Sequence, residues 1–195
     1  SGVDPEKIMA MGITHQRCTI VPVDESVKPL RNAILWNDSR CIEQVKLVWN
    51  NIGAKRVYER TGYPPGVFWS LYKAMWVRDN EPQVYNKTSL WLLVFDYLVY
   101  KLTGNLLTTS GSATMTGCLD IANPLRWATD IIEACGIPTE AWPKIYPPAV
   151  EVGAVTKKAA KETGLPEGLP IVSAAGDQPC GPLGAGVVKP GLMGV

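Results

Sequence analysis

One acidic residue, Asp177, follows an apolar segment at a place where a carboxylate could take part in chemistry. Residues 171–175 are small or apolar and favour a buried β-strand, with Ser173 the only polar side chain among them. Gly176 then allows a turn, and Pro179 suits the first turn of a helix because its nitrogen carries no hydrogen. Ligands of open α/β sheets bind at the carboxyl ends of strands. This order of residues makes Asp177 a candidate catalytic base.

A purely structural role also accounts for Asp177. A carboxylate at the N-cap of a helix accepts hydrogen bonds from unpaired backbone N–H groups. Spacing alone does not separate the two roles and slightly favours the cap. Asp96 raises the same question, because it follows a predicted strand over residues 90–94 and falls in the first turn of a predicted helix over residues 95–102. Negative charge there suits the helix dipole, so we assign Asp96 a structural role.

A second polar group, formed by Gln16, Arg17 and Cys18, interrupts a β-branched segment. If residues 13–19 are extended, His15 and Arg17 face one way, whereas Gln16 and Cys18 face the other. The arginine could bind two neighbouring oxygen atoms. Cys18 is either a reactive thiol beside that cation or, as we prefer, a small and partly buried pocket residue. His15 is expected to hydrogen bond at the end of a strand rather than to act as a base.

Composition excludes several classes of protein. The 195 residues are 46% hydrophobic and 19% charged, which is typical of an ordered globular chain. The net charge of +1 includes no basic block, so we expect neither a nucleic-acid nor a membrane partner. The longest apolar run, residues 90–95, is too short to cross a bilayer. Five widely spaced cysteines favour reduced thiols and a cytoplasmic location, and the single histidine argues against a zinc site.

The remaining segments alternate between strand-like and helix-like patterns, which is typical of an α/β fold. Breaker residues predict loops over residues 61–66 and 108–116, and the second lacks the Gly-x-x-x-x-Gly-Lys-Ser/Thr pattern of a phosphate-binding loop. The aromatic side chains of Trp69, Tyr72 and Trp76, after the first loop, are assigned to the core, with stacking on a ligand as the less favoured alternative. Helices are predicted over residues 39–51, 68–78, 95–102, 127–135 and 156–163, and further strands over residues 8–23 and 33–36.

Four motifs, taken together and in order, resemble the FGGY family of carbohydrate kinases over essentially the whole chain. The family's fold is the actin-like, ribonuclease-H-like ATPase fold, so the resemblance implies an α/β domain with a mixed sheet flanked by helices. The motifs are Gly-Ile-Thr-His-Gln-Arg at 12–17, Ala-Ile-Leu-Trp-Asn-Asp-Ser-Arg at 33–40, Asp-Tyr-Leu at 96–98 ahead of Leu-Thr-Gly at 102–104, and Ala-Gly-Asp-Gln at 175–178 ahead of Gly-Ala-Gly at 184–186.

The same resemblance identifies residues 1–195 as one partial domain, most of the family's N-terminal, sugar-binding domain. The first phosphate-binding hairpin and the C-terminal ATP domain would lie outside the chain. Both ends agree with a fragment, because Ser1 leads almost directly into a strand and residues 191–195 resemble the start of another. We therefore expect these residues, taken alone, to have no kinase activity.

The resemblance implies ATP-dependent phosphorylation of a hydroxyl on a small sugar or polyol, with the Trp-Asn-Asp-x-Arg motif favouring a pentulose or related ketose. ATP and Mg²⁺ would be bound mainly by parts outside this chain, to which we assign neither a cofactor-binding nor a metal-binding residue. A homodimer of the full-length protein is compatible with the family. The resemblance implies that Asp177 is the general base and that the sugar is contacted by Gln16, Arg17, Cys18, Phe68 and Gln178.

Two positions depart from the family pattern. Glycerol kinases have a glutamate after the motif arginine, and xylulokinases carry Met-His-Gly in the matching stretch, whereas Cys18 follows Arg17 here. Phe68 stands where the family has a tyrosine, so one hydroxyl contact is lost. These differences argue against glycerol as the substrate. Two alternatives stay open: a sugar-binding pseudokinase, and a non-sugar ATPase of the same superfold.

Overall fold

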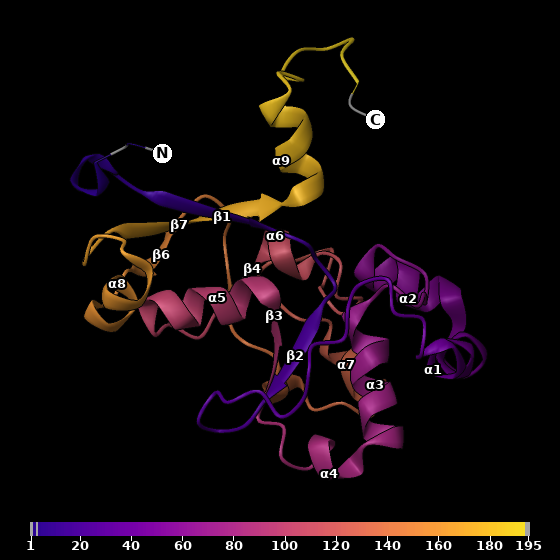
Figure 1. Ribbon diagram of the computed structural model, residues 1–195. Coiled ribbons are helices and arrows are strands. Elements are labelled where there is room, and N and C mark those ends of the chain that lie inside the picture. Colours follow the sequence, from indigo (N-terminus) through magenta and orange to yellow (C-terminus); the bar gives the residue numbers. More distant parts are fainter. Residues whose placement is uncertain (1, 3, 194–195) are drawn as a thin grey trace.

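The computed structural model describes residue 2 and residues 4–193 (Figure 1). Its largest sheet is mixed and has the order β1-β7-β6, formed by Met11–His15, Pro170–Gly176 and Glu151–Ala154. β1 and β7 run parallel, whereas β6 is antiparallel to β7. Because parallel strands end at the same edge of a sheet, the residues that follow β1 and β7 come together. This pairing positions the candidate site.

Two short sheets complete the β-structure of the described residues. In the first, β2 (Ile20–Val23) is antiparallel to β3 (Leu90–Leu93). In the second, β4 (Thr108–Thr109) is parallel to β5 (Ile145–Tyr146). Each strand of the first short sheet is almost completely buried, which agrees with its run of apolar side chains.

Helices occupy both sides of the large sheet, so the fold is α/β as predicted. In Figure 1, α5 and α8 lie on one side of the sheet, whereas α9 rises from the end of β7 on the other side. The helices are η1 (Pro5–Lys7), α1 (Ile42–Val48), η2 (Trp49–Gly53), α2 (Ala54–Thr61), α3 (Ser70–Asn80), α4 (Pro82–Tyr85), α5 (Val94–Thr103), α6 (Ser110–Ala113), α7 (Thr129–Ala134), η3 (Thr139–Ala141), α8 (Lys157–Thr163) and α9 (Asp177–Gly184).

Two hydrophobic cores hold the elements that bear the site. The larger core contains Leu71 and Met75 of α3 together with Leu93 of β3, and it fixes the helix that follows the loop of residues 62–69. The smaller core contains Phe95 of α5 and Ile171 of β7, and it fixes the large sheet. The candidate site therefore lies where two separately packed regions meet.

Local signals predicted several helix ends correctly. The Thr156 hydroxyl accepts a hydrogen bond from the Ala159 N–H at 3.2 Å and caps α8, which ends at Gly164 with a φ of +76°. Gly104, with a φ of +81°, ends α5 in the same way. These predictions succeed because a cap and a left-handed glycine act within a few residues.

Other predictions are wrong because contacts distant in sequence decide the structure. Residues 33–36 form no strand and contribute only a single bridge between Ile34 and Ile20. Residues 108–116 are not a loop throughout, since they form β4 and α6 and bury the hydroxyls of Thr109 and Ser112 against each other. Hydroxyl-rich residues look like a loop in sequence, but here their hydrogen bonds are made inside the protein.

Three further expectations need correction. The helix expected from residue 39 starts at Ile42, and the Asp38 carboxylate accepts hydrogen bonds from Arg40 instead of capping it. β1 ends at His15, so residues 13–19 are not extended throughout. Residues 191–193 form no strand, and the rest of that expected element, residues 194–195, lies outside the described residues.

Two findings concern membrane crossing and thiols. No helix in the part of the chain that the structure describes combines the length and the apolar character needed to span a bilayer. All five cysteines are free thiols, and four of them are buried.

Candidate functional site

The residues that follow β1 and β7 line one cavity of about 340 Å³. One side of the cavity comes from the connection between β1 and β2 and from the start of α9. The other side comes from aromatic and apolar side chains of three loops. Every site residue predicted from the sequence therefore lies on the same cavity, whose lining is Gln16, Arg17, Cys18, Trp36, Phe68, Trp69, Met115, Asp177 and Gln178.

Asp177 is exposed to this cavity and is the first residue of α9. The helix has Gly176 at its N-cap, and no side chain caps its N-terminus, so the capping role that spacing slightly favoured is wrong. Within the described residues, the Asp177 carboxylate has neither an ion-pair partner nor a hydrogen-bond donor. Its oxygens are therefore available to a ligand hydroxyl.

Arg17 reaches the cavity by crossing the end of β7. A Cβ atom on Gly176 would lie 2.5 Å from Arg17 Nε and 2.7 Å from Arg17 Cδ, so only glycine leaves room for this path. Nη2 of the arginine donates to Gln178 Oε1 at 2.7 Å, and Nη1 donates to Thr114 Oγ1 at 3.4 Å. The guanidinium forms no ion pair with a carboxylate in the described part of the chain. Its positive charge can therefore serve ligand oxygens.

Cys18 is a neutral lining residue rather than a reactive thiolate. Its φ of +66° places it in the left-handed region, which is uncommon for a residue with a side chain. The thiol donates to the Met115 carbonyl at 3.1 Å, and the Cys18 carbonyl accepts from the Ser70 hydroxyl at 3.1 Å. Burial raises the pKa of Cys18 to about 11, so the thiol stays protonated near neutral pH. Of the two roles considered from the sequence, the structure agrees with the pocket residue.

His15 is the hydrogen-bonding residue at a strand end that the sequence predicted. It is buried, and its Nε2 lies 3.0 Å from the Ser112 hydroxyl. Its Nδ1 lies 3.1 Å from the Gln16 carbonyl oxygen. Burial lowers the pKa of His15, which favours the neutral ring. His15 thus supports the backbone from which Arg17 extends.

Aromatic rings form the opposite wall of the cavity. Trp36 and Phe68 stack with centroids 6.1 Å apart and an interplanar angle of 26°, and Trp69 meets Phe68 edge-on at 6.2 Å. The Trp69 indole is fixed by a hydrogen bond from its Nε1 to the Pro64 carbonyl at 2.8 Å. The wall therefore offers apolar faces opposite the charged groups of Arg17 and Asp177.

The sequence did not predict three lining residues. Trp36 belongs to a quoted motif but was given no role, and Trp69 was assigned to the core. Met115 carries no signal, because it is an isolated large apolar residue in a segment that was expected to be a loop. A tryptophan directly before an Asn-Asp turn was the signal that could have placed Trp36 at the surface.

Two observations bear on metal and phosphate binding. The described residues contain no group of three or more His, Cys, Asp or Glu side chains that could hold a metal ion. The whole sequence also lacks the glycine-rich phosphate loop considered above. We derive no step through a metal ion from this chain.

A second cavity, of about 410 Å³, lies away from the ends of β1 and β7. Its lining includes Lys28, Lys101, Lys158 and Glu162, together with two tyrosines. It does not combine an unpaired carboxylate with an arginine and an amide side chain. The chemistry described above therefore belongs to the smaller cavity.

Comparison with known proteins agrees with this geometry. The N-terminal domain of the FGGY family of carbohydrate kinases matches residues 1–184. The chain is 33% identical over 202 residues to the xylulose kinase of Bacillus subtilis, covering 98% of this chain and 38% of that protein. It is 30% identical over 195 residues to the glycerol kinase of Thermococcus onnurineus, with 98% and 38% covered.

Among solved structures, the xylulose kinase of Rhodospirillum rubrum superposes with a TM-score of 0.86 at 30% identity, covering 92% of this chain and 37% of that one. This similarity confirms the expected actin-like ATPase fold. The chain spans little more than a third of the length of these relatives. On this evidence the chain belongs to the FGGY family of carbohydrate kinases and corresponds to the N-terminal domain of that family.

Proposed function

We propose that this chain provides the sugar-binding part of an ATP-dependent kinase that phosphorylates a hydroxyl of a small ketose or polyol. The observation that carries the proposal is the Asp177 carboxylate, which is unpaired among the described residues and lines the same cavity as Arg17 and Gln178. Membership of a carbohydrate kinase family supports it. So does the size of the cavity, since small-molecule sites begin at about 300 Å³.

The proposed reaction needs an oriented nucleophile more than covalent help from the protein. Asp177 accepts the proton of the substrate hydroxyl while the hydroxyl oxygen attacks the γ-phosphorus of ATP. The new O–P bond forms as the bond to ADP breaks, and the proton leaves Asp177 to solvent afterwards. Arg17 donates to substrate oxygens, and the amide of Gln178 both donates and accepts. Binding at these two residues aims the reacting hydroxyl at Asp177.

We propose a pentulose or a related ketose as the substrate. Cys18 is neutral at the position where glycerol kinases are expected to use a glutamate, so an acidic contact to glycerol is lost. The stacked faces of Trp36 and Phe68 provide an apolar surface for the C–H groups of a longer carbon chain. ATP and Mg²⁺ would be held mainly by residues outside this chain. The 195 residues alone are then expected to turn over no ATP, and measurable turnover would contradict this.

A panel of pentuloses, hexuloses and polyols, each incubated with ATP and the complete gene product, tests the proposal. We expect ADP release that depends on one ketose or polyol, together with a phosphate ester of that compound. Binding of a sugar without ADP release would instead indicate a pseudokinase. ADP release that no sugar stimulates would indicate a non-sugar ATPase. Either result would overturn the proposed function.

A further inference from the structure

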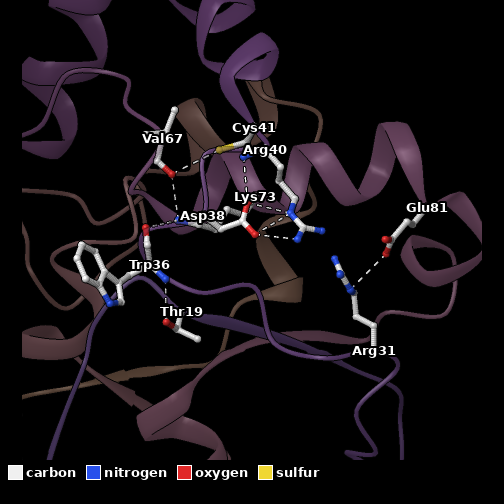
Figure 2. Close-up of polar contacts among 9 residues, drawn as sticks. All are labelled: Thr19, Arg31, Trp36, Asp38, Arg40, Cys41, Val67, Lys73 and Glu81. Carbon is white, nitrogen blue, oxygen red and sulfur yellow. Dashed lines mark hydrogen bonds and ion pairs between the residues drawn. The ribbon is translucent and has the colours of Figure 1, made fainter.

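Lys73, in α3, carries a completely buried side chain. Its ammonium donates to the backbone carbonyl of Phe68 at 2.5 Å. It also donates to the carbonyls of Val67 and Trp36, at 3.0 and 3.3 Å (Figure 2). These carbonyls use all three N–H donors of the group. In the described part of the chain, no carboxylate forms an ion pair with Lys73. The positive charge of the ammonium is therefore stabilised by these carbonyls.

This arrangement is costly, because a buried charge without an opposite partner is poorly compensated. Burial lowers the pKa of Lys73, while Cys41, Cys18 and Asp38 act in the opposite direction. An apolar side chain of similar length could fill the space, but it would leave the three carbonyls without this donor. The specific contribution of Lys73 is thus to bind, through its one ammonium group, backbone carbonyls from two separate loops.

Two of these three carbonyls belong to Trp36 and Phe68, which form the aromatic wall of the candidate site. Trp36 and Phe68 stack on each other, yet each remains 45% exposed, so burial alone does not fix them. Two further contacts hold these loops. The Trp36 N–H donates to Thr19 Oγ1, just before β2, at 3.0 Å. The Cys41 thiol donates to the Val67 carbonyl at 3.5 Å and joins the two loops directly. Lys73 lies at the junction of these loops in Figure 2.

The loop that bears Trp36 also has an anchor that does not involve Lys73. Asp38 accepts from the Arg40 guanidinium at 2.7 to 3.0 Å, and that guanidinium lies 4.7 Å from the Trp76 ring centroid. Arg31, 3.4 Å from Glu81, lies near the same tryptophan ring. Loss of Lys73 would therefore displace the ring of Trp36 while the following turn stays in place.

We infer that Lys73 is a positioning residue that holds the Trp36 and Phe68 rings in place through the backbone carbonyls of the two loops. It sets the affinity of the cavity for sugar and does not itself touch the substrate. This inference rests on the proposed function, because it assigns the aromatic wall to sugar binding.

Lys73→Met in the complete gene product tests the role by separating KM from kcat. We expect the KM for the sugar to rise by about tenfold or more, with kcat and the KM for ATP changed by less than about twofold. Val77→Ala is the matched control, since Val77 is fully buried on the same helix and packs in the larger core. The control should lose stability with an unchanged KM. An equal KM effect in both variants would overturn the inference.

A background that lacks both rings shows whether Lys73 acts through them. In the Trp36→Ala, Phe68→Ala double variant, adding Lys73→Met should change the KM for sugar by less than about twofold. An undiminished effect of Lys73→Met in that background would contradict action through the rings.

A fluorine NMR spectrum tests the same inference and requires no enzymatic activity. The seven tryptophans can be labelled with 5-fluorotryptophan, and the Trp36 signal assigned from its loss in Trp36→Phe. Lys73→Met should shift the Trp36 fluorine signal, whereas the signal of Trp49 on η2 should stay unchanged. If the protein phosphorylates no sugar, the proposed function fails but this readout still tests Lys73. An unmoved Trp36 signal in the folded variant would refute positioning by Lys73. If Lys73→Met does not fold, Lys73→Gln gives the same test with a smaller expected shift.

Discussion

Asp96 and Asp177 both follow a strand and fall in the first turn of a helix, and their carboxylates end in opposite environments. Asp96 is 1% exposed, and its Oδ2 accepts the Leu93 N–H at 2.8 Å. Burial raises the pKa of Asp96 to about 7, against the opposing effect of its hydrogen bonds. Asp177 is exposed, caps nothing and lines the cavity.

The difference comes from the partner strand rather than from the local sequence. β7 is parallel to β1, so a second strand ends beside Asp177 and brings Arg17 with it. β3 is antiparallel to β2, so the end of β3 lies opposite Ile20, where β2 begins. Two strand ends that meet leave a cleft at Asp177, whereas the single strand end before Asp96 is closed by packing. An acid after a strand therefore indicates a site only when a parallel neighbour ends beside it.

The largest expected effect is on kcat, which should depend on Asp177 and not on Asp96. In the complete gene product, Asp177→Asn should lower kcat by ~10²–10⁴-fold, the usual contribution of a general base. Asp96→Asn should change kcat by less than about threefold, since that side chain does not reach the cavity. Steady-state kinetics with the sugar found by the panel gives both values. Equal losses in the two variants would show that the contrast between the acids is not one of function.

The free energy of unfolding should show the opposite pattern and depend on Asp96 more than on Asp177. At pH 5, Asp96→Ala should lower the free energy of unfolding by about 2–3 kcal/mol, because the Leu93 N–H loses its buried acceptor. Asp177→Ala should change it by less than about 0.5 kcal/mol, as is usual for an exposed residue without such a contact. Urea unfolding followed by circular dichroism measures both. A larger loss of stability in Asp177→Ala than in Asp96→Ala would show that Asp177, not Asp96, has the structural role.

The raised pKa of Asp96 also makes stability depend on pH. A folded-state pKa above the unfolded value means that the folded protein binds the proton more tightly. This contribution is complete below about pH 4 and is lost as the pH rises to about 7. Wild type should therefore lose on the order of 2–3 kcal/mol relative to Asp96→Asn between pH 5 and pH 8. Parallel pH profiles of the two proteins would contradict the raised pKa.

A smaller effect tests the path of Arg17 over the end of β7. Gly176→Ala should raise the KM for sugar by ~10-fold, about 1.4 kcal/mol, because the new Cβ displaces the arginine side chain. Gly181→Ala, in the helix α9 that follows Gly176, is the control, since a Cβ there meets no atom within 4 Å. The control should leave the KM unchanged. A normal KM in Gly176→Ala would mean that the position of Arg17 does not matter for binding.

The sequence was informative where structure depends on near neighbours. β7 with α9, the capped helix α8 and the glycine-terminated helix α5 were all expected close to their observed positions. The segment of residues 108–116 was missed because several of its hydroxyls are bonded inside the protein, to near residues and to the distant His15. Local composition cannot distinguish a hydroxyl bonded inside the protein from one bonded to water.

The residues of the candidate site also divide into those that the sequence predicted and those that it did not. Asp177, Arg17 and Gln178 were named from motifs, and the parallel pairing of β1 and β7 brings them to one cavity. Lys73 was not named, because a lysine in a helix normally indicates an exposed face. Its three carbonyl partners come from loops whose positions no local pattern predicts.

The central claim is that Asp177 takes the proton of the hydroxyl to which the phosphoryl group is transferred. A crystal structure of the complete gene product with the sugar that the panel identifies tests this claim most directly. We predict one sugar hydroxyl within ~2.6–3.2 Å of an Asp177 carboxylate oxygen, with Arg17 and Gln178 contacting other oxygens of the same molecule. A sugar bound with every hydroxyl beyond hydrogen-bonding distance of Asp177, or bound in the cavity lined by Lys28, Lys101 and Lys158, would contradict it.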